Sequence, residues 1–371
     1  LGLPWTNVVF SAGGNFLIVA PADAIDGLND WLDEINEKLL ALHRGDLYLA
    51  LVSQTIPARL YADGSSVNVT GSLAEHRAGL QKRLEASKRA AFAKLAPAHY
   101  AMLFDPIGDG GGGERCHICH VELDERTWVE ESEGELLLCE QCHSFAFPSK
   151  PTYDSLAWSV ANADYLLISE YSEPISLDKY RNGKGNPPWT VVLNALGLDY
   201  QLIQRGDRIP SGPGTLLSFD PDRFLPVSPE PGTSYGFSFL SQLTPREDPT
   251  RKEIRDFGSM ARLDSVGIPR YGVLRMDVDS LGQMMSGQGL MYADLLHVSA
   301  LSNALSYFFG GMLDHIGRDC TDAWQAWTAE WSGKQVEAIH KWPYIIYAGG
   351  DDLFIVASWD LLPPLAQAIQ K

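Results

Sequence analysis

Two stretches near opposite ends of the chain share one pattern. Residues 344–357 are Tyr-Ile-Ile-Tyr-Ala-Gly-Gly-Asp-Asp-Leu-Phe-Ile-Val-Ala, and residues 8–20 are Val-Val-Phe-Ser-Ala-Gly-Gly-Asn-Phe-Leu-Ile-Val-Ala. In each, β-branched and aromatic residues flank a Gly-Gly pair, which predicts a β-hairpin that turns at the glycines. Two matching units favour paired domains of one fold. Two unrelated hairpins that share Ala-Gly-Gly are the alternative.

The turn of the later hairpin carries carboxylates, whereas the turn of the earlier one does not. Asp351 and Asp352 follow the second Gly-Gly pair, but Asn-Phe follows the first. At Gly349 and Gly350 the backbone is uncovered, so a phosphate can approach it closely. Glycine and aspartate are also common in solvated turns, so this motif alone does not establish a site.

A second acidic stretch supports the functional interpretation. Residues 271–281 form an apolar, strand-like run that ends in Asp277 and Asp279, and carboxylates at i and i+2 point the same way on a strand. Nucleotidyl-transfer palms and cyclases bring such a strand beside an acidic hairpin, where two divalent ions about 4 Å apart clamp the attacking and leaving oxygens. We therefore predict that Asp277, Asp351 and Asp352 are catalytic and bind Mg²⁺ or Mn²⁺.

Nucleotide contacts are expected around these acids. A helix predicted at roughly residues 292–312 carries four small polar residues, Ser299, Ser302, Asn303 and Ser306, which could line a base pocket. Exposed small polar residues would explain them equally well. Asp279 could orient ligands or simply be solvated. The predicted nucleotide-binding set comprises Val278, Asp279, Ser302, Gly349 and Gly350.

Composition narrows the function classes. The net charge is −18, which argues against a surface that coats nucleic acid broadly, because such surfaces hold phosphates through cationic side chains. Any contact with nucleic acid would pass through partner subunits or a local patch. The basic residues of a helix predicted at 72–96 are more typical of a solvated face. No apolar run is long enough to span a bilayer and the start lacks a basic region, so we expect no membrane anchor and a cytoplasmic protein.

Four of the five cysteines form two close pairs. Cys116 and Cys119 are separated from Cys139 and Cys142 by nineteen residues. This spacing predicts a zinc ribbon in which two knuckles bind a structural Zn²⁺ and a β-hairpin lies between them. Four thiolates leave no position for a substrate. His117, His120 and His143 could replace a cysteine, although four cysteines are the simpler ligand set.

The remaining segments complete an α+β chain. We predict two palm-like, cyclase-like (ferredoxin-like) domains that flank a zinc ribbon and an α/β insert. The boundaries are 1–107 for the first palm with a helical extension, 108–150 for the linker and zinc ribbon, 151–262 for the insert and 263–371 for the second palm. Smaller elements are expected as helices at 22–43 and 189–198 and as strands at 47–52 and 164–168, with a Pro/Gly-rich region at 208–245.

The order of the motifs along the chain resembles that of the large signature subunit of type III CRISPR effector complexes. These motifs are the palm-like hairpin, the cysteine knuckles, the insert, the Met-Asp-Val-Asp-Ser-Leu-Gly strand end, the serine-bearing helix and Tyr-Ala-Gly-Gly-Asp-Asp. The Csm (III-A) branch is the more similar one. The resemblance implies that the second palm converts ATP into cyclic 3′-5′ oligoadenylate when target RNA is bound. It also implies other complex subunits as partners, with guide RNA and target RNA contacted mostly through the complex.

By position, Asp351 and Asp352 match the catalytic pair of that family, and Asp277 matches its strand carboxylate. The chain has no His-Asp dipeptide, so we expect a fragment without the family's HD nuclease domain, which cuts single-stranded DNA. The start of the first palm and the end of the second are also expected to be missing. Two rival functions stay open: a GGDEF-type cyclase that joins two GTP, whose motif differs at Asp352-Leu353, and a catalytically silent scaffold subunit.

Overall fold

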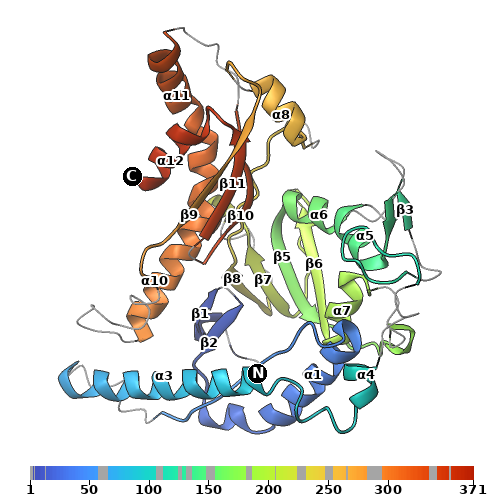
Figure 1. Cartoon of the computed structure of the whole chain (residues 1–371). Coiled ribbons are helices and arrows are strands. Elements are labelled where there is room, and N and C mark those ends of the chain that lie inside the picture. Colours follow the sequence, from blue (N-terminus) through green and yellow to red (C-terminus); the bar gives the residue numbers. More distant parts are fainter. Residues whose placement is uncertain are drawn as a thin grey trace. The chain divides into compact units, whose positions relative to one another are not determined.

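A computed structural model covers the whole chain (Figure 1). It describes residues 3, 5–12, 14–56, 66–105, 112–123, 128–130, 136–147, 155–180, 186–204, 206–223, 231–246, 254–264, 266–281, 295–333, 341–350 and 352–371. The chain divides into two compact units. Unit 1 comprises residues 1–3, 20–160 and 166–215, and unit 2 comprises residues 4–19, 161–165 and 216–371. In the described ranges no helix is both long enough and apolar enough to cross a membrane.

Unit 2 contains the predicted acidic hairpin in a three-stranded antiparallel sheet. Strands β10 (Tyr344–Gly349) and β11 (Asp352–Ser358) form the hairpin, and β9 (Tyr271–Asp277) pairs with the other edge of β11. Gly350 has a φ of +68°, which glycine adopts easily and which lets the chain reverse within two residues. The predicted hairpin and its neighbouring strand are therefore confirmed.

One face of this sheet packs into the hydrophobic core of unit 2. Alternate residues of β11, namely Leu353, Ile355 and Ala357, are almost completely buried. They pack in one cluster with residues of α11 (Leu313–Ser332) and α12 (Leu362–Gln370). Because side chains alternate across a strand, the even-numbered residues of β11 share the opposite face with Asp352.

Helix α10 (Leu295–Tyr307) does not end near Met312 as predicted. It continues through a π-helical turn (Phe308–Met312) directly into α11, so the described helical run extends from residue 295 to 332. The two glycines of this turn allow close approach of neighbouring backbone: a Cβ on Gly310 would lie 2.2 Å from the carbonyl oxygen of Phe239. The apolar stripe that predicts the helix ends at Phe308 and Phe309, so it does not reveal the continuation into α11.

The N-terminal hairpin is also confirmed and belongs to unit 2. Strand β1 (Val8–Ala12) pairs antiparallel with β2 (Asn15–Ile18), and Gly14 has a φ of +73° at the turn. The open end follows the short η1 turn (Trp5–Asn7) and is closed by two bonds. The Val19 amide donates to the Asn7 carbonyl at 2.9 Å, and the Asn7 side-chain amide donates to the Val19 carbonyl at 2.6 Å. Helix α10 packs against β1.

In the helical part of unit 1, the helix predicted at 22–43 is confirmed except for its start, and the strand predicted at 47–52 is wrong. After the short η2 turn (Ala22–Ile25), α1 (Leu28–His43) begins only beyond Gly27, whose φ is +76°. Residues 47–52 form no strand. Instead, the Asn36 side chain donates to the Leu49 carbonyl at 3.0 Å and accepts from the Leu49 amide at 2.9 Å, which satisfies the backbone groups that a neighbouring strand would otherwise bind.

Two further helices of unit 1 are α3 (Ser66–Arg89) and α4 (Tyr100–Phe104). The helix predicted at 72–96 thus begins at Ser66 and ends at Arg89, and residues 90–98 form successive turns. The cysteine region has the predicted hairpin, β3 (Trp128–Glu130) paired with β4 (Leu136–Leu138), followed by α5 (Glu140–Ala146).

The central part of the chain forms a four-stranded sheet in the order β6-β5-β7-β8. Its strands are β5 (Ala163–Glu170), β6 (Leu198–Gln204), β7 (Gly214–Ser218) and β8 (Thr233–Phe237). The helices are α6 (Leu156–Asn162), α7 (Trp189–Ala195) and α8 (Phe257–Asp264), with short turns η3 (Asp178–Tyr180) and η4 (Pro221–Arg223). The predicted strand at 164–168 is confirmed. The helix predicted at 189–198 ends earlier, and the Pro/Gly-rich region contains two strands that the sequence interpretation missed.

Candidate functional site

Two predicted catalytic carboxylates are direct neighbours across the sheet of unit 2. Asp277, the last residue of β9, is the cross-strand partner of Asp352, the first residue of β11. Directly opposite residues of an antiparallel pair have Cα atoms roughly 4.5–5.5 Å apart and side chains on the same face. Exposure alternates along β9, with Arg275 and Asp277 exposed and Leu274 and Met276 partly buried in the core cluster. The two carboxylates therefore lie on the face of the sheet that is opposite the core.

The charges of this pair suit a shared cation. Like charges directly opposite each other destabilise a sheet, whereas a divalent cation would attract both. Carboxylate oxygens are also the ligands that Mg²⁺ and Mn²⁺ prefer. Asp277 and Asp352 thus fit a catalytic metal site. Asp351, the third predicted ligand, lies outside the described residues.

The other two residues predicted near the strand end lie elsewhere. Strand β9 ends at Asp277, so the prediction that Asp279 lies on the same strand is wrong: Asp279 is exposed in a turn, and Ser280 has a φ of +61°. Val278 packs against the hydrophobic core of unit 2.

A cavity of about 300 Å³ lies beside the Gly-Gly turn, entirely within unit 2. Three of the predicted nucleotide-binding residues, Ser302, Gly349 and Gly350, line it, whereas Val278 and Asp279 are not among the described residues that do. Gly349 is also the cross-strand partner of Asp352. The cavity wall and the carboxylate pair therefore meet at one end of the sheet. The lining comprises Val8 to Ser11, Phe237 to Phe239, Ser302, Asn303, Ser306, Phe309, Gly310 and Tyr347 to Gly350.

The lining suits a small aromatic ligand with polar edges. Phe237 and Phe239 stack with ring centroids 4.8 Å apart, while Ser302, Asn303 and Ser306 present hydroxyl and amide groups from α10. Apolar walls with a few polar groups are typical of ligand pockets, and this volume is near the lower end of their usual range. Sequence reasoning missed the Phe237–Phe239 wall, because it lies in the Pro/Gly-rich region where no motif marks it.

The four paired cysteines converge as predicted. One ligand atom from each lies within 4.8 Å of all the others, and the Cys119 and Cys139 sulfurs are 3.6 Å apart. Burial and the neighbouring cysteines raise the pKa of the Cys142 thiol. Burial also acts to raise the pKa of Cys116. Hydrogen bonds from backbone N–H groups to its sulfur outweigh burial and lower the pKa to about 7. A tetrahedral Zn²⁺ fits this cluster, because binding a cation removes the repulsion between thiolates.

The histidines named as substitutes have other surroundings. The His117 Nδ1 accepts from the Leu137 amide at 3.3 Å, and the buried His143 ring stacks on Phe147 with centroids 5.8 Å apart. Asn186 supports the cluster from outside, since its side-chain amide donates to the Cys119 sulfur at 3.7 Å. The structure therefore brings together a set of four cysteines. The fifth, Cys320, is buried elsewhere, and burial raises the pKa of its thiol to about 12.

Zinc affinity is expected to fall steeply as the pH decreases. Every ligand must be deprotonated, and burial raises the pKa of Cys119 to about 11, so metal binding at neutral pH must displace protons. Lowering the pH favours the protonated thiols and therefore the metal-free state. Zinc content measured by atomic emission after dialysis between pH 8 and pH 5 should show near-complete occupancy at pH 8 and loss at pH 5. The Cys139→Ser variant should lose zinc at a higher pH, whereas Cys320→Ser should match the wild type. Equal retention at pH 5 and pH 8 would contradict this.

Two known protein domains match the two end segments of the chain. The Cas10/Cmr2 second palm domain matches residues 270–371, and the Csm1 subunit domain B matches residues 1–106. Residues 270–371 contain the carboxylate pair and the acidic hairpin, and residues 1–106 contain the Ala-Gly-Gly hairpin without acids.

Two curated relatives match the whole chain. Both are CRISPR system single-strand-specific deoxyribonucleases Cas10/Csm1 of subtype III-A, one from Methanocaldococcus jannaschii and one from Thermococcus onnurineus. The first is 26% identical over 392 residues, and the match covers 100% of this chain and 45% of the relative. The second is 26% identical over 383 residues, with 100% and 42% covered. The chain spans less than half the length of these relatives.

Solved structures of similar proteins have the same fold. The Csm1-Csm4 cassette in complex with AMPPNP has a TM-score of 0.60 at 20% identity, and the match covers 100% of this chain and 40% of that one. The cassette in complex with cA4 gives a TM-score of 0.58 at 19% identity with the same coverage. The resemblance inferred from the motifs is thus confirmed over the full chain.

Proposed function

Because this chain is related over its whole length to the Cas10/Csm1 subunits of subtype III-A CRISPR systems, we propose that it carries the nucleotidyltransferase centre of such a subunit and makes cyclic 3′-5′ oligoadenylate from ATP when target RNA is bound. One observation carries the proposal. Gly349 lines a cavity and pairs with Asp352, which in turn pairs with Asp277, so a nucleotide-sized space adjoins two carboxylates.

Each part of the site would take one part of ATP. The adenine would enter the cavity between the phenylalanine wall and the hydroxyl groups of α10. The phosphates would lie along the uncovered backbone of Gly349 and Gly350, and Asp277, Asp351 and Asp352 would hold the cations. Two bound divalent cations supply charge neutralisation and lower the pKa of the attacking hydroxyl. The 3′-hydroxyl of a second ATP attacks the α-phosphorus, and pyrophosphate leaves.

The N-terminal hairpin is the place proposed for the second ATP. Residues Val8 to Ser11 of β1 line the same cavity as the Gly349–Gly350 turn. Where the second hairpin has its acids, the first has Asn15 and Phe16. The first hairpin could therefore hold a nucleotide through its backbone and apolar groups without binding a catalytic cation.

The similar structures support the choice of ligand and partner. They include Csm1-Csm4 cassettes in complex with one ATP, with pppApA, with pppApApA and with cA4. We propose that this chain binds ATP and short oligoadenylates and assembles with a Csm4-type subunit, while guide and target RNA act through the complex. The relatives are also named as deoxyribonucleases. We do not assign that activity to these residues, because the family's His-Asp dipeptide does not occur in the sequence.

Nucleotide preference separates this function from its enzymatic rival. We expect the full-length protein, with Mg²⁺, to bind ATP at least about tenfold more tightly than GTP, which corresponds to roughly one well-formed hydrogen bond. Ser302→Ala should weaken ATP binding several-fold, since Ser302 is buried and lines the cavity. Ser299→Ala, on the same helix but not among the lining residues, is the matched control. Tighter binding of GTP, measured by calorimetry, would favour the GGDEF-type cyclase instead.

A further inference from the structure

The phenylalanine wall of the cavity belongs to an irregular segment, residues 237–243, that follows β8. On one side this segment is held to the end of β7: the Ser238 amide donates to the Ser218 carbonyl at 2.9 Å, and the Leu240 amide donates to the Phe219 carbonyl at 3.2 Å. Only Phe237 to Phe239 line the cavity. Residues 241–243 face helix α11 and make a separate set of contacts.

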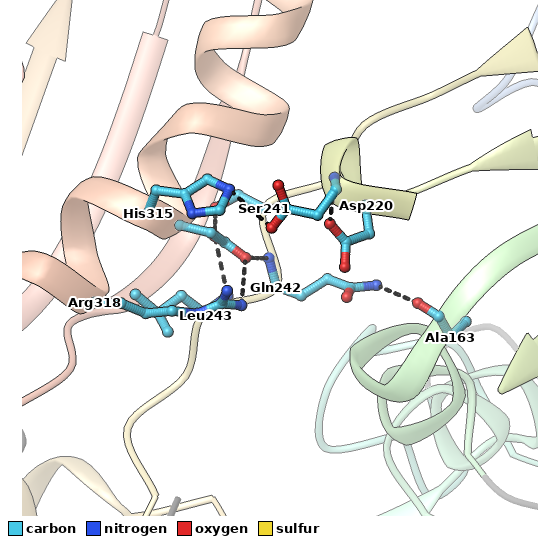
Figure 2. A network of polar contacts seen from close by, with 9 residues as sticks. Ala163, Asp220, Ser241, Gln242, Leu243, His315 and Arg318 are labelled. Atoms are coloured by element: carbon cyan, nitrogen blue, oxygen red, sulfur yellow. Dashed lines mark hydrogen bonds and ion pairs between the residues drawn. The ribbon is translucent and has the colours of Figure 1, made fainter. Parts of the chain in front are cut away.

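A single buried carboxylate fixes those three residues (Figure 2). Asp314 of α11 is 8% exposed, and it accepts hydrogen bonds from the Ser241 hydroxyl, from the Gln242 amide at 3.0 Å and from the Leu243 amide at 3.3 Å. Arg318, one turn further along α11, lies 3.7 Å from the same carboxylate. Burial raises the pKa of the Asp314 carboxyl, while the hydrogen bonds from Ser241 and Gln242 oppose that change.

The segment also contacts the helix next to the cavity. Phe239 packs against the π-helical turn so closely that any side chain at Gly310 would collide with its carbonyl group. The Phe239 ring meets Tyr307 edge to face, with centroids 5.7 Å apart. Gln242 extends in the opposite direction, where its side-chain amide donates to the Ala163 carbonyl at 3.1 Å. Asp314 therefore links the phenylalanine wall to the same continuous helix that carries Ser302.

We propose that Asp314 is a positioning residue for nucleotide binding: by holding residues 241–243 against α11, it sets the distance between the Phe237–Phe239 wall and the polar face of α10. This inference rests on the proposed function of the cavity. Asp314 itself is not among the residues that line the cavity, so its effect on the nucleotide passes through the segment.

The Asp314→Asn variant tests the proposal. Asparagine has nearly the same shape but replaces one acceptor oxygen with a donor, which cannot accept from both backbone amides. In the full-length protein with its partner subunits, we expect the Kd for AMPPNP and the KM for ATP to rise roughly tenfold, because small displacements of a binding wall have large effects, while kcat changes by less than about threefold. Ser241→Ala removes one donor and keeps the carboxylate, so it should raise the Kd by about threefold.

Asp222→Asn is the matched control. Asp222 lies 3.4 Å from His315, the residue next to Asp314 on α11, but it is exposed and forms no hydrogen bond or ion pair with residues 241–243 in the described part of the chain. It should leave the Kd unchanged. An unchanged Kd in both Asp314→Asn and Ser241→Ala would overturn the proposal. A fall in the kcat of Asp314→Asn at constant KM would also overturn it, because that result indicates only a smaller folded fraction. Because the AMPPNP Kd requires no turnover, it tests the positioning role even if the wild type makes no oligoadenylate.

Discussion

Replacing Asp352 with asparagine is expected to lower oligoadenylate synthesis by roughly a thousandfold. Asp352 faces Asp277 across the sheet, and both are proposed to hold cations that stabilise the transition state by several kcal/mol. Losing about 4 kcal/mol of that stabilisation corresponds to a thousandfold in rate. Asp277→Asn should have a similar effect. The rate of labelled product formation from ATP, with Mg²⁺ and target RNA, measures both.

The Asp352→Asn substitution should not weaken the fold. It removes one of two like charges that stand directly opposite, so without divalent cations the melting temperature should stay constant or rise. A rate loss with no loss of stability distinguishes a catalytic carboxylate from a structural one. Asp322→Asn, an exposed aspartate on α11, should leave both quantities unchanged. If Asp352→Asn kept more than a tenth of the wild-type rate, the metal-binding role of this carboxylate would be wrong.

The second large effect is on the free energy of unfolding and concerns a buried ion pair in unit 2. Asp360 is completely buried, and one of its carboxylate oxygens accepts from Lys341 at 3.0 Å, from the Trp324 indole at 2.9 Å and from the Val266 amide at 3.1 Å. Lys341 is also buried, and its ammonium group lies 3.7 Å above the Trp324 ring. These contacts connect α11, the end of β11 and the segment that precedes β9.

Asp360→Ala should reduce the free energy of unfolding by about 3–5 kcal/mol, because it removes the carboxylate that pairs with a buried ammonium group. Combining it with Lys341→Met should recover part of this loss, since neither charge then remains buried. Urea denaturation followed by tryptophan fluorescence gives both values. Lys38→Ala, which breaks the exposed pair between Lys38 and Glu34, is the control and should shift the midpoint little. A double variant less stable than Asp360→Ala alone would contradict this account.

The features that could be predicted from the sequence are those encoded by neighbouring residues. Both hairpins follow from Gly-Gly between β-branched runs, and the pairing of Asp277 with Asp352 follows from a strand placed beside an acidic turn. The convergence of Cys116, Cys119, Cys139 and Cys142 into one cluster follows from their spacing. In each case the signal spans a few residues, and the geometry of one turn or knuckle is enough to interpret it.

The errors concern contacts between residues far apart in the chain. Residues 47–52 form no strand because the Asn36 side chain satisfies the backbone of Leu49, and no local pattern reveals that. The helix continues past Gly310 because Phe239 packs there. Asp314 and residues 241–243 are more than 70 positions apart, so nothing near Asp314 in the sequence distinguishes it from an exposed helical acid.

The central claim is that the carboxylates beside the Gly349–Gly350 turn catalyse the joining of ATP. The most direct test incubates the full-length protein, assembled with guide and target RNA, with labelled ATP and Mg²⁺ or Mn²⁺, beside the Asp351→Ala/Asp352→Ala variant. We expect cyclic 3′-5′ oligoadenylate from the wild type and none from the variant. Equal product from both would show that these carboxylates do not catalyse the reaction, and no product from either in a correctly assembled complex would favour the scaffold subunit.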